Sequence, residues 1–169
     1  MCIRDSVATG MVIEGKAGFQ IMGDWAKGEF TAAGKVPGVD YYCAATPSNN
    51  GYLYNVDSFI FYKSSDPDKQ AGQKLLAKLM MGKNFQKVFN LYKGSIPARL
   101  DVSMDEFDKC AKTSNADIKT AGAKGGLVPS FAHGMAQGNT MKAALQDIIT
   151  EHFNSDMSSV DAANALADS

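Results

Sequence analysis

The residue with the most specific chemistry in this chain is its single tryptophan, Trp25. Apolar residues alternate with their neighbours over 17–22, and this period of two predicts a β-strand. Asp24 is then expected to cap a helix over 25–33. Open α/β sheets bind ligands just past the ends of their strands, so Trp25 is a candidate ligand contact. The alternative is a core tryptophan beside a surface turn.

Three ionisable residues are further candidates. Asp57 lies inside an apolar, aromatic-rich stretch over 53–62 that predicts a strand, where a charge is costly unless it has a partner. It is either a site residue or a carboxylate that pairs with a cation or caps a turn. Lys93 precedes Gly94 at a predicted helix end, where a cation is also ordinary. His133 lies in a predicted loop, where a structural histidine is the alternative.

Enzymatic patterns are weak. Asp57 and His133 supply two members of a catalytic triad, but no Gly-x-Ser-x-Gly nucleophile motif accompanies them. Asp24 and Asp57 are a possible carboxylate pair for glycoside hydrolysis, which requires a separation that sequence does not give. The glycine-rich stretch 122–126 lacks the Lys-Ser/Thr ending of a phosphate-binding loop. These patterns do not favour an enzyme.

Composition narrows the class further. The chain has 169 residues and a formal net charge of -1 without a basic stripe, so no nucleic-acid partner is indicated. Apolar runs fall short of the roughly 18 residues that cross a membrane. Two histidines and the cysteines lie far apart in the sequence, so neither a metal nor another cofactor is expected. Setting Cys2 aside, Cys43 and Cys110 form an even pair that suits an oxidising compartment.

Periodicity predicts many helices and few strands. The predicted strands are 17–22, 41–45 and 53–62. The predicted helices are 25–33, 67–80, 82–93, 104–111 (capped by Ser103 with Glu106), 114–126, 140–153 and 158–167. The stretch 127–135 is expected to be irregular. This is an α/β pattern with too few strands for a complete α/β domain.

Several short motifs together resemble a known family. They are the stretch 15–30 with its Gly-Asp-Trp, then 54–62 (YNVDSFIFY), 89–99 (FNLYKGSIPAR) and 128–135 (VPSFAHGM). In order and spacing they resemble the C-terminal half of bacterial extracellular solute-binding proteins, the maltose-binding-like sugar receptors of ABC importers, and within these the glucose/mannose-binding branch. The resemblance implies part of a two-lobed periplasmic-binding-protein fold.

The resemblance also implies an organisation. Residues 1–6 match the translation of a common transposase sequencing adapter, so native sequence is expected from Val7, and a genuine N-terminus is the alternative. Segments 7–48 and 98–169 would belong to the second lobe, and 49–97 would hold the hinge crossings and a returning segment of the first. The crossings would fall at 48–51 and 94–97.

The resemblance implies roles for the four candidates. Trp25 would stack on a monosaccharide such as glucose, Asp57 would accept hydrogen bonds from its hydroxyls, Lys93 would donate, and His133 would donate or accept. The secondary candidates are Asn55, Ser58 and Ser95. The implied partner is the membrane permease of an ABC importer, and the implied setting is a periplasmic monomer. The missing signal peptide carries no information about location. A glycosidase, or a receptor for another small solute, stays the alternative.

Two further expectations concern structure. If Cys43 and Cys110 both lie in the second lobe they should form a disulfide, and two buried free thiols are the alternative. The helix carrying Leu75, Leu76, Leu79 and Met80 should expose an apolar face, because much of the sheet it would cover is not in this sequence. For the same reason the chain alone is expected to bind sugar weakly.

Overall fold

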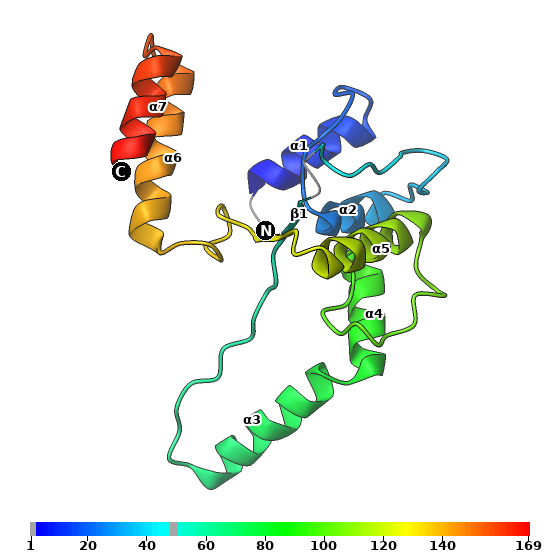
Figure 1. Ribbon diagram of the computed structural model, residues 1–169. Helices are drawn as coiled ribbons and strands as arrows, with labels where there is room; N and C mark the ends of the chain where they lie inside the picture. The colour runs from blue at the N-terminus through cyan, green and yellow to red at the C-terminus, as the bar shows by residue number, and fades with distance from the viewer. Residues whose placement is uncertain (1–2, 48–50) are drawn as a thin grey trace.

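The computed structural model of the protein describes residues 3–47 and 51–169. Its elements in chain order are α1 (Ile3–Ile13), the 3₁₀ helix η1 (Asp24–Ala26), α2 (Lys27–Ala32), β1 (Tyr52–Tyr54), α3 (Pro67–Met80), α4 (Lys83–Lys93), α5 (Lys109–Ala123), β2 (Leu127–Pro129), α6 (Asn139–Asn154) and α7 (Ser159–Asp168). The result is the helix-rich arrangement with few strands that the sequence predicts (Figure 1). Residues 1–2 of the expected adapter segment and 48–50 of the first expected crossing lie outside the described residues.

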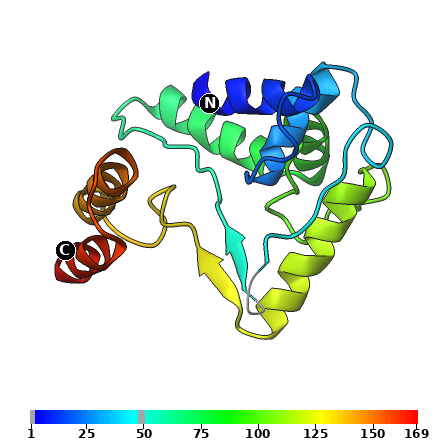
Figure 2. The same cartoon turned by 90° about the horizontal axis from the view of Figure 1, so that it is seen from above.

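The two short strands form a parallel pair. Tyr52 lies opposite Leu127 and Tyr54 opposite Pro129, and β2 directly follows α5. Parallel strands are joined by crossovers, and here the connection runs through α3, α4 and α5. Figure 2 shows the two arrows side by side, with α5 leading into the second.

The predicted strands are mostly wrong. Residues 17–22 and 42–47 are irregular, Tyr41 forms only an isolated bridge with Pro37, and only the start of 53–62 is a strand. Beyond β1 the chain runs alone and extended to α3 (Figure 1). A strand needs a neighbour for its N–H and C=O groups, and the described chain places none beside these segments.

Helices with local capping signals form where they are predicted. Asp66 accepts hydrogen bonds from the backbone N–H groups of Asp68 and Lys69, and Pro67 opens α3. α4 ends at Gly94, whose φ of 89° is left-handed. α7 is capped by Ser158, which accepts from the N–H of Asp161. In Figures 1 and 2 the hairpin of α6 and α7 stands apart from the other helices.

The predicted helix over 104–111 is wrong. Ser103 instead accepts from the N–H of Asp105 in a tight turn, and α5 begins at Lys109 with Asp108 as its cap. The turn brings Phe107 into a small buried cluster with Val102 and Ala111. Burial of this aromatic side chain outweighs the local capping signal.

Helix α1 is not predicted from the sequence. It is tied to the following irregular segment by Thr9, whose hydroxyl lies 2.9 Å from both the Asp5 carbonyl and the Gln20 side-chain oxygen. The exposed face of α3 is confirmed for three residues: Leu75, Leu76 and Leu79 are exposed. Met80, by contrast, is buried.

Two links join the region around α2 to α5. The predicted disulfide is confirmed: Cys43 and Cys110 are bonded, with Cα atoms 5.6 Å apart. Nearby, the buried Lys27 ammonium donates to Asp108 at 2.7 Å. Burial alone would raise the pKa of Asp108, but the hydrogen bonds from Lys27 and from the N–H of Ala111 lower it below its ordinary value.

Candidate functional site

The four candidate residues come from four separate segments. Trp25 lies in η1, Asp57 in the extended chain after β1, Lys93 at the end of α4, and His133 in the turns after β2. Lys93 and Asp57 form an ion pair. The rings of Trp25 and His133 meet edge to face, with centroids 5.2 Å apart and planes at 82°. The fold thus brings the four side chains together as two contacting pairs.

The electrostatics join the two pairs. The hydrogen bond from Lys93 is the main cause that lowers the pKa of Asp57, against burial, which raises it. The Lys93 charge, the Asn55 amide and His133 lower it further. Asn55 Nδ2 donates to Asp57 Oδ1 at 3.1 Å. Asp57 is therefore held as a carboxylate, an acceptor-only group.

This carboxylate stays accessible. The Asp57 side chain is 66% exposed and that of Lys93 is 30% exposed. The pairing of Asp57 with a cation, one of the two alternatives for this residue, is present as the ion pair with Lys93. It does not compete with a binding role, because an exposed pair has lone pairs and N–H groups left for a ligand.

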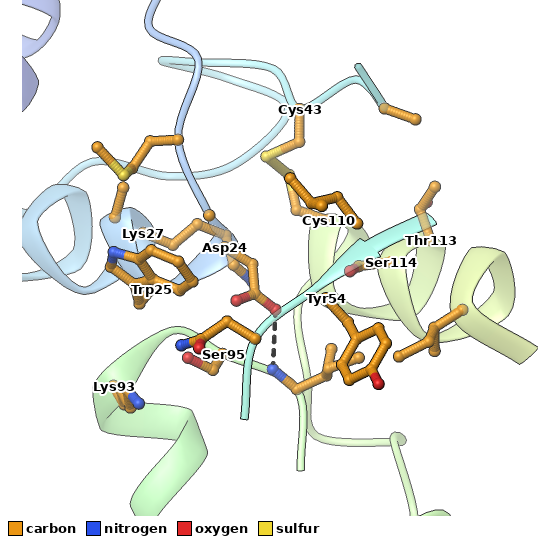
Figure 3. Close-up of a pocket in the computed structure, with 18 of the residues that line it drawn as sticks. Asp24, Trp25, Lys27, Cys43, Tyr54, Lys93, Ser95, Cys110, Thr113 and Ser114 are labelled. Carbon is orange, nitrogen blue, oxygen red and sulfur yellow. Dashed lines mark hydrogen bonds between the residues drawn. A yellow bond between two sulfur atoms is a disulfide. The ribbon is translucent and has the colours of Figure 1, made fainter. Parts of the chain in front are cut away.

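An open cleft of about 1300 Å³ runs between these elements. Trp25, Asp57 and Lys93 line it, and His133 adjoins it through Trp25. The three secondary candidates line it as well: Asn55, Ser58 and Ser95. Figure 3 shows Trp25 and Lys93 on one side of the cleft and the Cys43–Cys110 disulfide on another.

Asp24 has a different role from the predicted one. It does not cap a helix; its Oδ2 accepts the backbone N–H of Ile96 at 3.0 Å, the bond drawn as a dashed line in Figure 3. Burial raises the pKa of Asp24, and the opposing effects of the Ile96 hydrogen bond, Lys27 and Lys93 do not cancel it. The Asp24 carboxylate therefore holds the 94–97 segment next to Trp25 through this hydrogen bond.

The backbone around Trp25 packs directly on the end of α4. A Cβ at Gly28 would lie 2.8 Å from the carbonyl oxygen of Lys93 and 3.3 Å from that of Tyr92. The absence of a side chain at Gly28 thus lets the segment that carries Trp25 approach the segment that carries Lys93.

Replacing Gly28 with alanine should therefore destabilise the protein by about 1–3 kcal/mol, because the clash is with backbone that cannot move aside cheaply. Chemical denaturation followed by the Trp25 fluorescence would measure it. The matched control is Gly72→Ala within α3, where nothing lies within 4 Å and a gain of about 1 kcal/mol is expected. Equal effects of the two substitutions would contradict the close-approach argument.

Sequence reasoning missed a group of hydroxyls on the opposite wall. Tyr52 and Tyr54 of β1 and Thr113 and Ser114 of α5 line the cleft. The Tyr52 hydroxyl lies 2.6 Å from Ser114 Oγ, and burial raises the pKa of Tyr52. The alternation of tyrosines around Leu53 was a usable signal that both face one side. Nothing in the helical segment distinguished its cleft-facing hydroxyls.

The described residues hold neither of two features that other classes of protein would show. No helix among them is long and apolar enough to cross a membrane. Within the same residues, no three His, Cys, Asp or Glu side chains gather as potential metal ligands.

Comparison with known proteins finds clear relatives, although no family profile matches the chain. A probable sugar-binding periplasmic protein of Brucella suis is 47% identical over 162 residues, 95% of this chain and 38% of the relative. An uncharacterised ABC transporter extracellular-binding protein of Pyrococcus horikoshii is 37% identical over 145 residues, 85% of this chain and 32% of the relative. A xylose/arabinose-binding protein of Haloferax volcanii is 31% identical over 130 residues, 74% of this chain and 27% of the relative.

The chain spans about two fifths of the length of the Brucella suis relative, 38%. The similarity nevertheless covers nearly all of the chain. The chain is thus homologous, along 95% of its length, to part of a probable sugar-binding periplasmic protein.

Proposed function

We propose that this chain is part of the substrate-binding component of an ABC carbohydrate importer. The protein would bind a glucose-like monosaccharide in a cleft between two lobes and deliver it to the membrane permease. The observation that carries the proposal is the meeting of an aromatic ring, a carboxylate, an ammonium and an imidazole from four distant segments at one cleft. The names of the relatives support the same class.

The chemistry of the four groups matches a sugar. An indole such as Trp25 packs against the apolar C–H face of a sugar ring. The Asp57 carboxylate accepts hydrogen bonds from neighbouring hydroxyls, and the Lys93 ammonium donates to a hydroxyl or ring oxygen. His133, in contact with Trp25, borders the same side of the cleft.

In the proposed arrangement, the second lobe is built from residues 7–48 and 98–169. Residues 49–97 hold the crossings between the lobes and a segment that returns to the first lobe. Supporting this assignment, the Cys43–Cys110 disulfide and the Lys27–Asp108 ion pair both join 7–48 to 98–169. Asp24 binds the backbone of the 94–97 crossing. Lobe closure around such crossings would clamp the ligand.

The proposed setting is the periplasm, where a disulfide is stable, with a monomeric receptor that needs no cofactor. The Haloferax volcanii relative favours one variant of this proposal, a receptor for a pentose in place of glucose. Glycoside hydrolysis is the rival from another class. It needs one carboxyl that acts as a general acid. Burial raises the pKa of Asp24, but the Asp24 carboxylate already accepts the backbone N–H of Ile96, and Lys93 lowers the pKa of Asp57.

Titration calorimetry with glucose, xylose and arabinose would test the proposal, together with a product assay on aryl glycosides. A full-length receptor that contains this chain should bind one sugar tightly and release no product. The 169-residue chain alone should bind weakly, because a site that buries most of its ligand needs both walls. Turnover of any glycoside, or no sugar binding by the complete protein, would overturn the proposal.

A further inference from the structure

The side chain of Ser130 lies directly against the His133 ring. Ser130 Oγ is 2.6 Å from His133 Nδ1. We propose that Ser130 is a positioning residue that sets the tautomer of His133, leaving the neutral ring with its proton on Nε2. The role of that proton as a donor to a sugar rests on the proposed function, whereas the tautomer itself does not.

Ser130 is buried, and its backbone is held by hydrogen bonds on both sides. It is 3% exposed, and it follows β2 directly. Its backbone N–H donates to the Tyr54 carbonyl at 2.8 Å, and its carbonyl accepts from the N–H of Met135 at 3.0 Å. Both ends of the turn that carries the exposed His133 are thereby held. A hydroxyl on such a fixed backbone restricts the ring that it contacts.

The direction of the hydrogen bond follows from proton counting. A neutral imidazole has one donor and one acceptor nitrogen, and a hydroxyl has one proton. If Nδ1–H donated to Oγ, the Ser130 proton would need another acceptor, and in the part of the chain that the structure describes His133 is the partner found for Oγ. A buried, unpaired O–H is costly. The hydroxyl therefore donates to Nδ1, and the ring proton resides on Nε2.

The consequence concerns ligand choice. Asp57 is an acceptor-only carboxylate and Lys93 a donor-only ammonium. With its proton on Nε2, His133 is a second donor beside Trp25. The site then offers two hydrogen-bond donors, Lys93 and His133, to the hydroxyl or ring oxygens of a sugar. Asp57 is the acceptor for the sugar's hydroxyl protons. A ligand group that can only donate finds no partner at His133.

A second histidine in the chain serves as an internal reference for the tautomer of His133. Of its two histidines, the other is His152, whose Nδ1 lies 2.9 Å from the carbonyl oxygen of Met157. A carbonyl oxygen only accepts, so His152 must carry its proton on Nδ1 when neutral. The two histidines are therefore expected to show opposite tautomers in one spectrum.

Long-range ¹H–¹⁵N correlation spectra of the ¹⁵N-labelled chain would decide this. They should be recorded at alkaline pH, so that both rings are neutral. His133 should show the ¹⁵N shift of a protonated Nε2 and an unprotonated, hydrogen-bonded Nδ1, with the reverse pattern for His152. A protonated Nδ1 in His133 overturns the proposal on the wild-type spectrum alone.

The variants Ser130→Ala and Ser130→Thr test whether the Ser130 hydroxyl sets the tautomer of His133. The alanine variant should move the His133 Nδ1 resonance away from its hydrogen-bonded position, and the threonine variant, which keeps the hydroxyl, should restore it. The His152 pattern should be unchanged in both, and the backbone amide spectrum around Tyr54 and Trp25 should report that the fold beside Ser130 is intact. An unmoved His133 in a folded Ser130→Ala would refute the positioning role. Since no sugar is present, failure here is distinct from failure of the proposed sugar-binding function.

Discussion

Asp57→Ala should weaken monosaccharide binding by the complete receptor about 10- to 150-fold. Hydrogen bonds to a charged group contribute about 1.5–3 kcal/mol, and their loss leaves sugar hydroxyls unpaired in a closed cleft. The substitution also removes the ion-pair partner of Lys93. Of the four candidate side chains, Asp57 is the one whose removal should cost the most, and calorimetry on purified protein would measure it.

Two further variants separate the causes of this loss. Trp25→Ala should also weaken binding, through the lost stacking surface, while keeping the Asp57–Lys93 pair intact. The matched control is Asp147→Ala in α6, which removes an exposed carboxylate outside the cleft lining and should leave affinity unchanged. If Asp57→Ala and Trp25→Ala both bind as tightly as the wild type, the site assignment is wrong.

Removing the Cys43–Cys110 disulfide should lower the free energy of unfolding by about 4 kcal/mol. The two cysteines are 67 positions apart, and a cross-link over so long a loop removes much of the conformational entropy of the unfolded chain. Guanidinium denaturation of Cys43→Ser/Cys110→Ser against the oxidised protein would show the difference as a lower midpoint. Both proteins should carry Cys2→Ser so that the third cysteine does not exchange.

Reductant supplies the control for this experiment. Dithiothreitol should lower the unfolding midpoint of the oxidised protein to that of the double variant and leave the double variant unchanged. A midpoint that reductant does not move would show that the bridge contributes nothing to stability. Sugar binding by the complete receptor should survive reduction under mild conditions, because neither sulfur is among the four proposed ligand contacts.

Elements whose stabilising partners are near in sequence could be predicted. α3 begins at the Asp66 cap and α4 ends at Gly94, because capping hydrogen bonds and a left-handed glycine act within a few residues. α6 and α7 follow from helical periodicity in the same way. The strands predicted over 17–22 and 41–45 failed, because alternation specifies a face but does not provide the neighbouring strand.

For the candidate site, too, the residue types could be predicted from the sequence, whereas the contacts between them could not. Residue types and the family resemblance together identified Trp25, Asp57, Lys93 and His133 as candidates, and the paired cysteines as a disulfide. They did not show which of them touch. The Lys93–Asp57 pair joins positions 36 apart, and the Trp25–His133 contact joins η1 to the turns after β2.

Local patterns in the sequence are enough to specify most helices of this protein, their caps and the types of side chain available for binding. The tertiary structure alone decided that α5 starts at Lys109, since burial of Phe107 and the Lys27 partner of the Asp108 cap lie beyond any local pattern. It alone also decided that Asp24 accepts the backbone N–H of Ile96 and that the backbone N–H of Ser130 donates to the Tyr54 carbonyl. The physical reason is that such contacts depend on the paths of segments far apart in the chain, and those paths are fixed by packing rather than by neighbouring residues.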